Sequence, residues 1–420
     1  MNNDLIELQE MKMKGTPYFS ENKWVSPLNF MKEIPFNKFP KRVKIHDVTL
    51  RDGEQTCGLV WREDERVYIA ESLSDLGVDR IEVGMPVISD ENMRAIKRLT
   101  SMNLKSEIVA FCRALRKDID AAYDSGANRI IVEHAVNPYV NKFVYNSSAE
   151  EVISKVVECI LYAKDKNMRV TFMGWDTTRS NLDYVLKIFS EIAQKANPAS
   201  IVFVDSFGVA TPFSIKFVFE ELRKVIPDSI ELEFHVHNEF GLAMGSVLAA
   251  IVGGACTIHS SMNGLGERTG NVATEQVVAA LKILLNINTG VDLTKLWRVS
   301  KLIQDISKTS PSYNSPVIGE KLFWVESGIV VDALRKLNAK GIQSAMTPYM
   351  PKLVGRDGPE IKLGAFSGKS SVKFFLEAKN ISVTDKEFEK IVDKIQYEGR
   401  IRKAILEESE ILRIIYEVIG

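Results

Sequence analysis

The sequence lacks the features of an exported or membrane-embedded protein. Its 420 residues include only four cysteines, none in C-x-x-C spacing. Such scattered thiols predict reduced side chains rather than a disulfide framework or a structural zinc site. Charged residues interrupt every apolar run well before the ~20 residues that a membrane helix needs, and the first residues lack the basic start of a secretion signal. We therefore expect a cytoplasmic protein with no membrane partner.

The sequence also lacks a surplus of positive charge. Fifty-four Lys and Arg residues stand against fifty-five Asp and Glu residues, which leaves a formal net charge of -1. A protein that neutralises a phosphate backbone needs a basic surplus, so nucleic acid is not an expected partner. The hydrophobic fraction of 45% over this length instead predicts a large buried core and more than one domain.

From about Arg42 the sequence alternates short β-rich runs with longer segments of helical period. Eight such units occupy residues 42–290, close to the ~250 residues typical of a (β/α)8 barrel. We therefore predict an α/β fold built on a TIM barrel; the alternative, an open doubly wound sheet, would not require the eighth unit. The predicted strands are Val43–Thr49, Arg80–Val83, Ser106–Phe111, Arg129–Glu133, Arg169–Gly174, Ser200–Asp205, Glu231–His237 and Thr257–Met262.

Two further regions flank the predicted barrel. Residues 1–41 are polar and broken by prolines, yet their many aromatic side chains predict an arm that packs on a surface. Residues 291–420 lose the β/α alternation and predict a mainly helical appendage. The helices expected there are Leu293–Ile306, Leu322–Leu337, Ser370–Lys379 and Asp385–Ile414.

Polar side chains close the first and seventh predicted strands, at the end where the active site of such a barrel lies. Thr49–Gln55 follows the first strand, and the seventh carries His235 and His237. Residues i and i+2 of a strand face the same side, so both imidazoles point into the barrel mouth, and Asp52 comes from a strand close by. Two imidazoles and a carboxylate predict a site for a divalent ion such as Mn, Zn, Fe, Co or Mg. The alternative is a pair of ordinary strand histidines.

A glycine-rich loop, Asn263–Asn271, directly follows the eighth predicted strand. Its three glycines allow close approach of the backbone to a ligand, and Asn271 offers an oxygen ligand. The alternative interpretation is a glycine-rich turn that merely precedes a helix. Its position after the eighth strand favours a part of the site.

These three segments together resemble the DRE-TIM metallolyase superfamily, and the G-x-G-E-R-x-G-N form of the loop is similar to its Claisen-condensing branch. That branch comprises the 2-isopropylmalate, homocitrate and citramalate synthases, which join the acetyl group of acetyl-CoA to a 2-oxo acid. Leu363–Lys369 is similar to a motif of the family's helical subdomain. The resemblance implies a divalent metal ion, acetyl-CoA as co-substrate and a homodimer. A leucine-sensing regulatory domain is not expected.

The resemblance also implies roles for single residues. Asp52, His235 and His237 would hold the ion, with Asn271 as a fourth ligand. Arg51, beside the ion, would bind the substrate and stabilise the alkoxide that develops during attack.

Other residues at the strand ends would contact the substrates. Gln55 and Glu267 would orient ligands or the thioester, and Gly266 lies in the loop that would bind the substrate. Ser206 would supply a hydroxyl to the substrate, or simply a hydrogen bond at its strand end. His134 would touch the tail of the oxo acid, or be a structural histidine.

The helical region departs from the family pattern. The family usually reads F-x-H-x-S-G-I-H there and uses the histidine and a tyrosine to handle the methyl proton of acetyl-CoA, whereas Phe323–Val330 has valine at both histidine positions. The tyrosine position falls on Met346, with Tyr349 close by. Glu326 and Tyr349 are therefore the predicted proton-handling groups. Three functions stay open: a condensing acyltransferase, a carbon–carbon lyase or aldolase, and a non-catalytic relative that retains the ion.

Overall fold

The computed structural model describes Met13, residues 15–34 and residues 39–420. Much of the predicted arm, namely residues 1–12, 14 and 35–38, lies outside these described residues. The chain divides into two compact units. The barrel unit spans Asn29–Pro311, and the terminal unit joins the described part of residues 1–28 to Ser312–Gly420.

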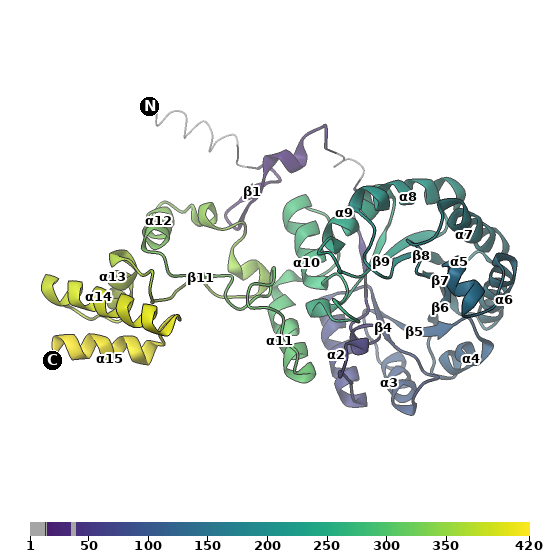
Figure 1. The fold of residues 1–420 in the computed structure, drawn as a ribbon, viewed down its shortest axis with the longest axis horizontal. Coiled ribbons are helices and arrows are strands. Elements are labelled where there is room, and N and C mark those ends of the chain that lie inside the picture. The colour runs from purple at the N-terminus through teal and green to yellow at the C-terminus, as the bar shows by residue number, and fades with distance from the viewer. Residues whose placement is uncertain (1–12, 14, 35–38) are drawn as a thin grey trace. The chain divides into compact units, whose positions relative to one another are not determined.

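Eight parallel strands close into a barrel in the barrel unit (Figure 1). They follow one another around the barrel in chain order, and the last pairs with the first through the register Ile258↔Ile45. This closure confirms the predicted TIM barrel and excludes the open sheet. The strands are β3 (Lys44–Asp47), β4 (Arg80–Gly84), β5 (Glu107–Arg113), β6 (Arg129–Ala135), β7 (Arg169–Trp175), β8 (Ser200–Asp205), β9 (Glu231–Val236) and β10 (Thr257–Ser260).

Helices surround the strands and cover the outside of the barrel (Figure 1). Local sequence sets their ends: Ser148 and Glu151 form a capping box at the start of α6, and Gly77 ends α2 with a left-handed φ of 102°. The helices are α2 (Glu63–Leu76), α3 (Asp90–Ser101), α4 (Arg116–Asp124), α5 (Pro138–Phe143), α6 (Ala149–Asp165), α7 (Leu182–Ala196), α8 (Pro212–Val225), α9 (Ala243–Gly253), α10 (Thr274–Ala279) and α11 (Leu296–Ser307), with short turns η1 (Pro27–Phe30), η3 (Gly53–Gln55), η4 (Met262–Gly264), η5 (Ala280–Leu284) and η6 (Leu293–Lys295).

Near the barrel mouth, the interior has a polar side and an apolar side. Alternate residues of a barrel strand face inward. The inward residues of β3, β4, β9 and β10 include the buried polar set His46, Glu82, Glu233 and His259. The strands β5 to β8 contribute one buried apolar cluster, made of Val109, Phe111, Ile131, Met173, Val202 and Val204. The two sides therefore offer different surroundings to whatever enters the barrel mouth.

The terminal unit combines two small sheets with helices. In its described part, Lys23 bridges to Tyr349, and the Trp24 amide donates to the Pro348 carbonyl at 3.1 Å. A buried cluster that includes Leu363, Ile395 and Ile415 forms its main apolar core. The elements are β1 (Phe19–Ser20), β2 (Lys23–Trp24), β11 (Trp324–Val325), α12 (Gly328–Asn338), η7 (Gln343–Met346), η8 (Pro351–Val354), β12 (Glu360–Ile361), α13 (Lys369–Ala378), α14 (Asp385–Arg402) and α15 (Glu408–Ile419).

Several predicted elements differ in extent from the observed ones, and three of the differences have a clear structural reason. The helix expected over Leu322–Leu337 begins only at Gly328, because Trp324–Val325 pairs as a strand with β12. The helix expected over Asp385–Ile414 is two helices, separated where Lys403 adopts a left-handed φ of 52°. The eighth strand, expected over Thr257–Met262, ends at Ser260 and passes into the turn η4.

Among the helices of the described residues, none is both long and apolar enough to cross a membrane.

Candidate functional site

The predicted metal ligands meet at the carboxyl end of the barrel strands. Asp52 follows β3, His235 lies in β9, and His237 comes directly after it. The Nε2 atoms of the two histidines lie 3.3 Å apart. The Asp52 Oδ2 atom lies 3.6 Å from Nε2 of His235 and 3.9 Å from Nε2 of His237. All three side chains are buried. Each can direct one ligand atom at a common point.

The glycine-rich loop completes this ligand set. The Asn271 Nδ2 atom donates to Asp52 Oδ1 at 2.8 Å and to the Leu265 carbonyl at 2.9 Å. The Oδ1 atom of Asn271 is buried without a hydrogen-bond partner among the described residues. Gly266 passes so close that a Cβ there would lie 2.9 Å from Asp52 Oδ1, and its φ of 151° disfavours a side chain. The loop therefore presents an unpaired oxygen beside the imidazoles and the carboxylate.

The electrostatics of the two histidines suit ligation. Burial, reinforced by the neighbouring His237, holds the pKa of His235 well below its ordinary value of 6.5. Burial also lowers the pKa of His237, although the Asp52 carboxylate opposes that shift. Both imidazoles are therefore neutral near pH 7 and keep a lone pair for an ion. Neutral imidazole, carboxylate and amide oxygen fit a divalent cation.

Arg51 lies beside the ligands and points across the mouth. Its Nε atom donates to Glu82, and its Nη1 atom donates to Asp52 at 3.0 Å. The guanidinium lies over the ring of Phe111, 4.3 Å from its centre. The Nη2 atom is buried without a hydrogen-bond partner among the described residues. Arg51 thus keeps one donor for an anionic oxygen near the ligand set.

Glu82 fixes the orientation of Arg51 and was not predicted as a site residue. Its carboxylate binds both Arg51 and the Nε2 atom of His46, the latter at 3.0 Å. Burial, the largest single influence, favours its neutral form, but the positive charge of Arg51 and the hydrogen bond with His46 together outweigh burial and lower the pKa of Glu82 to about 2. The carboxylate therefore stays charged and holds the guanidinium in place. The sequence did carry a signal for Glu82, because Arg80 and Glu82 are charged residues spaced i and i+2 in a buried strand and therefore face the same side.

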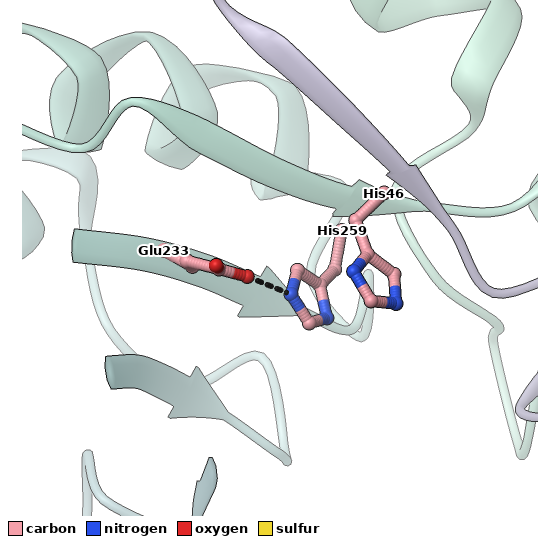
Figure 2. Close-up of side chains that lie close together, drawn as sticks. All are labelled: His46, Glu233 and His259. Carbon is pink, nitrogen blue, oxygen red and sulfur yellow. Dashed lines mark hydrogen bonds and ion pairs between the residues drawn. The ribbon is translucent and has the colours of Figure 1, made fainter. Parts of the chain in front are cut away.

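A second polar group lies behind Glu82 in the barrel interior, and Figure 2 shows its side chains. The rings of His46 and His259 stack 4.1 Å apart with an angle of 12° between their planes. The His259 Nε2 atom lies 2.8 Å from Glu233, which also accepts from Arg80 Nη1 at 2.6 Å. Lone pairs of imidazole lie in the ring plane, so two parallel rings do not converge on one ion. This group is therefore a packed polar layer that supports the site above it.

The barrel mouth encloses a cavity of about 420 Å³. The ligands Asp52, His235 and His237 line it together with Arg51. The predicted residues Gln55, Ser206 and Glu267 line it as well. The rest of the lining is Met85, Phe111, Arg113, Glu133, Met173, Trp175, Val204, Phe207 and Arg268. The Ser206 hydroxyl also accepts a hydrogen bond from the Asp176 amide at 2.8 Å.

His134 does not line this cavity, and of the two predicted roles the structure favours the structural histidine over the substrate contact. Successive residues of β6 face opposite sides, and Glu133 is the one that faces the cavity. The His134 ring packs against Tyr145 with 5.1 Å between ring centres. Sequence reasoning missed Glu133, although its spacing from the inward residue Ile131 predicts the inward direction.

The two predicted proton-handling residues belong to the terminal unit. The Glu326 Oε1 atom accepts a hydrogen bond from the Phe366 amide at 2.8 Å. The Tyr349 ring packs edge-on against Phe323, with 6.0 Å between ring centres. Burial raises the pKa of Tyr349 above its ordinary value of 10.0, so its hydroxyl is a proton donor near pH 7 rather than a base.

Comparison with known proteins places this site in a family. A family model described as HMGL-like matches residues 42–303, more than half of the chain. The chain belongs to the HMGL-like family. The predicted resemblance to the DRE-TIM superfamily is therefore confirmed, and the match covers the barrel and its ligand set.

Curated relatives of this HMGL-like chain are synthases. A homocitrate synthase of Methanothermobacter thermautotrophicus is 32% identical over 94% of this chain and 98% of the relative. A 2-isopropylmalate synthase of Methanocaldococcus jannaschii is 37% identical over 91% of this chain and 72% of the relative. An (R)-citramalate synthase of the same organism is 34% identical over 90% of this chain and 75% of the relative.

Solved structures extend the likeness in fold. The hydroxymethylglutaryl-CoA lyase of Pseudomonas aeruginosa superposes with a TM-score of 0.59 at 23% identity, over 65% of this chain and 95% of that one. At this identity the likeness concerns the fold alone.

Proposed function

We propose that this protein condenses acetyl-CoA with a small 2-oxo acid in a reaction that depends on a divalent metal ion. The product is a 2-hydroxy acid of the alkylmalate type, and the CoA thiol is released. The observation that carries the proposal is the meeting of Asp52, His235 and His237 beside the unpaired Nη2 donor of Arg51. The synthases at 32% to 37% identity support this reaction class.

The ligand set determines how the 2-oxo acid would lie. Asp52, His235, His237 and Asn271 would hold the ion, which when bound acts as a Lewis acid on the keto oxygen of the substrate. Arg51 supplies a buried donor to the same oxygen as it gains negative charge. Glu82 keeps this guanidinium oriented before the substrate arrives. Gln55, Glu267, Ser206 and Gly266 would contact the substrates around this centre.

The proton steps need one acceptor and one donor. The acetyl methyl loses a proton, its carbon attacks the keto carbon, and water then hydrolyses the thioester to release the CoA thiol. Tyr349, whose raised pKa keeps its hydroxyl protonated, is suited to donate. Glu326 would act as the acceptor. We propose that both reach the site in a homodimer, as the family resemblance implies, and that the enzyme works in the cytoplasm.

The decisive experiment measures free thiol. The purified full-length chain, first stripped with a chelator, is incubated with Mn2+, acetyl-CoA and each of a panel of 2-oxo acids. We expect thiol release that requires both the metal and one of the acids. Metal-dependent appearance of a 2-oxo acid from a 2-hydroxy acid, with no thiol release in any mixture, would instead identify a carbon–carbon lyase. Binding of Mn2+ without either product would indicate a non-catalytic relative.

A further inference from the structure

The far wall of the cavity carries one carboxyl group that the proposed reaction does not use. This group is Glu133, at the carboxyl end of β6. In the closed order of strands, β6 is three strands from β3 and three from β9. Glu133 therefore faces the ligands of β3 and β9 from the opposite side of the mouth.

Glu133 has no hydrogen bond or ion pair with other described residues at contact distance. The charged groups that act on it through space are Arg51, Arg113 and Glu82, and the Tyr145 hydroxyl lies within range as well. Arg113 is already committed, because its Nε and Nη2 atoms bind Asp118 at 2.8 and 3.1 Å. Burial raises the pKa of Glu133 to about 7, although Arg51 and Arg113 oppose the shift. Its carboxyl is thus available to a ligand.

The direction of the substrate follows from the position of the ligands. When the carboxylate and keto oxygens of a 2-oxo acid lie at the ion and at Arg51, the tail of the acid extends toward the far wall. Phe111, Met173 and Val204 give that wall an apolar surface. Above its pKa of about 7, Glu133 stands on the same wall as an anionic hydrogen-bond acceptor.

The cavity offers no counterpart for a second carboxylate on the tail. Three arginines line it in the described chain: Arg51, Arg113 and Arg268. Arg51 serves the reacting end, and the Asp118 carboxylate neutralises the charge of Arg113. The Arg268 Nε atom binds Glu239 at 2.5 Å, and its Nη2 atom binds the Ser206 carbonyl at 2.5 Å. A tail carboxylate would therefore meet Glu133 beside arginines whose charges are already balanced by Glu82, Asp118 and Glu239, so the repulsion is offset only in part.

We propose that Glu133 selects a 2-oxo acid whose apolar tail ends in a hydrogen-bond donor, and that it excludes an acid whose tail ends in a second carboxylate. This inference rests on the proposed function in one respect: the carboxylate and keto oxygens of the 2-oxo acid bind at the ion and at Arg51. It names a specificity-determining residue on a wall that makes no contribution to the ligand set.

Binding measurements test the inference without requiring turnover. Calorimetric titration of the Mn2+-loaded full-length protein at about pH 8.5, where Glu133 with its pKa of about 7 is ionised, gives a Kd for three acids: 4-hydroxy-2-oxobutanoate, its apolar isostere 2-oxopentanoate, and 2-oxoglutarate. The first should bind at least about tenfold more tightly than the second, since a hydrogen bond to a buried carboxyl is gained. The third should bind at least about tenfold more weakly than the second.

Two substitutions and a control sharpen the test. Glu133→Leu should abolish the preference for the hydroxyl tail, and the nearly isosteric Glu133→Gln should tighten 2-oxoglutarate by about tenfold. Glu71→Gln, on the exposed face of α2, should leave all three Kd values unchanged. Tightest binding of 2-oxoglutarate by the wild type, or an unchanged ranking in both Glu133 variants, would overturn the inference. An absence of thiol release with every acid would contradict the proposed reaction alone, since the ranking of Kd values stands apart from it.

Discussion

The two sides of the barrel interior differ in how their side chains are held. On the side of β3, β4, β9 and β10, nearly every inward polar group has a fixed partner: Arg51 binds Glu82, Glu82 binds His46, and His259 binds Glu233. On the side of β5 to β8 the polar pairs of Arg129, Thr171 and Ser200 lie at the amino ends of the strands, while the layer below the cavity is apolar and its one cavity-facing acid, Glu133, is without such a partner. Rigid polar contacts suit a centre that must hold charge in one geometry, whereas a smooth apolar wall adapts to the shape of a substrate.

We infer from this difference that the residues for the reaction and those for selectivity lie on different strands. The family match covers the whole barrel, but the motifs that carry the resemblance lie at β3, β9 and the loop after β10. The curated relatives are synthases named for three different products, homocitrate, 2-isopropylmalate and (R)-citramalate. We therefore expect changes on the polar side to abolish the reaction and changes on the apolar side to redirect it.

The largest effect should come from breaking the polar side at a ligand. His235→Ala removes one imidazole from the group that includes Asp52 and His237. We expect loss of bound Mn2+, and a fall in the rate of thiol release of about 10³-fold, because Lewis-acid assistance contributes several kcal/mol to the transition state. Metal content by atomic emission and thiol release are measured on the same sample. Full metal content with full activity in the variant would rule out the assigned site.

A smaller effect should follow from changing the donor beside the ion. Arg51→Lys keeps the positive charge but cannot bind Glu82, Asp52 and an alkoxide at once, as the planar guanidinium does. We expect kcat to fall by about 10²-fold with little change in bound metal. Steady-state kinetics with metal analysis separates this result from His235→Ala. Loss of the metal in Arg51→Lys would show that Arg51 mainly supports the ligands.

The apolar side should respond in specificity rather than in rate. Met173→Ala opens space beside Phe111 and Val204 in the cavity wall. We expect the ratio of kcat/KM for a long-tailed over a short-tailed 2-oxo acid to rise about tenfold, because each added methylene in an apolar pocket contributes about that factor. Metal content should not change. A uniform loss for all acids would mean that this wall also determines the geometry of the reacting end.

The polar side was largely predictable from sequence because its signals are local. Two histidines spaced i and i+2 in a strand, and an acid directly after another strand, specify a common direction by strand geometry alone. Closure of the barrel then brings Asp52 to the histidines. The network partner Glu82 was missed because its role depends on Arg51, which approaches it only in the folded chain.

The wrong predictions have two physical origins: strand pairing with a distant segment, and local signals that were overlooked. The strand Trp324–Val325 forms by pairing with Glu360–Ile361, a partner far along the chain, and an apolar run of that length is also compatible with a helix. The break between α14 and α15 did leave a local signal, since Glu407 and Glu410 form a capping box that starts the second helix. The substrate contact considered for His134 rested on its residue type, whereas alternation along β6 places Glu133 in the cavity.

The smallest expected effect concerns the free energy of unfolding rather than turnover, and it involves a buried acid beside the loop that follows β10. Glu275, in the first turn of α10, is fully buried, and its Oε2 atom accepts a hydrogen bond from the Asn263 amide at 3.0 Å. Burial raises the pKa of Glu275 from its ordinary value of 4.5 to about 7, since the hydrogen bond to Asn263 only partly opposes the cost of a buried charge. Between these two values the unfolded chain binds fewer protons than the folded one, so the free energy of unfolding falls as the pH rises from 4.5 to about 7.

Glu275→Gln keeps an acceptor for Asn263 and removes this titration. We therefore expect the variant to gain on the order of 2 kcal/mol in the free energy of unfolding above pH 7, and little near pH 4.5. Urea unfolding of both proteins across this pH range measures the difference, with Glu71→Gln as the exposed control. A difference that does not depend on pH would mean that Glu275 acts through packing alone. A pH-dependent gain with unchanged thiol release would show that the polar side bears the cost of buried charge in places that the reaction does not use.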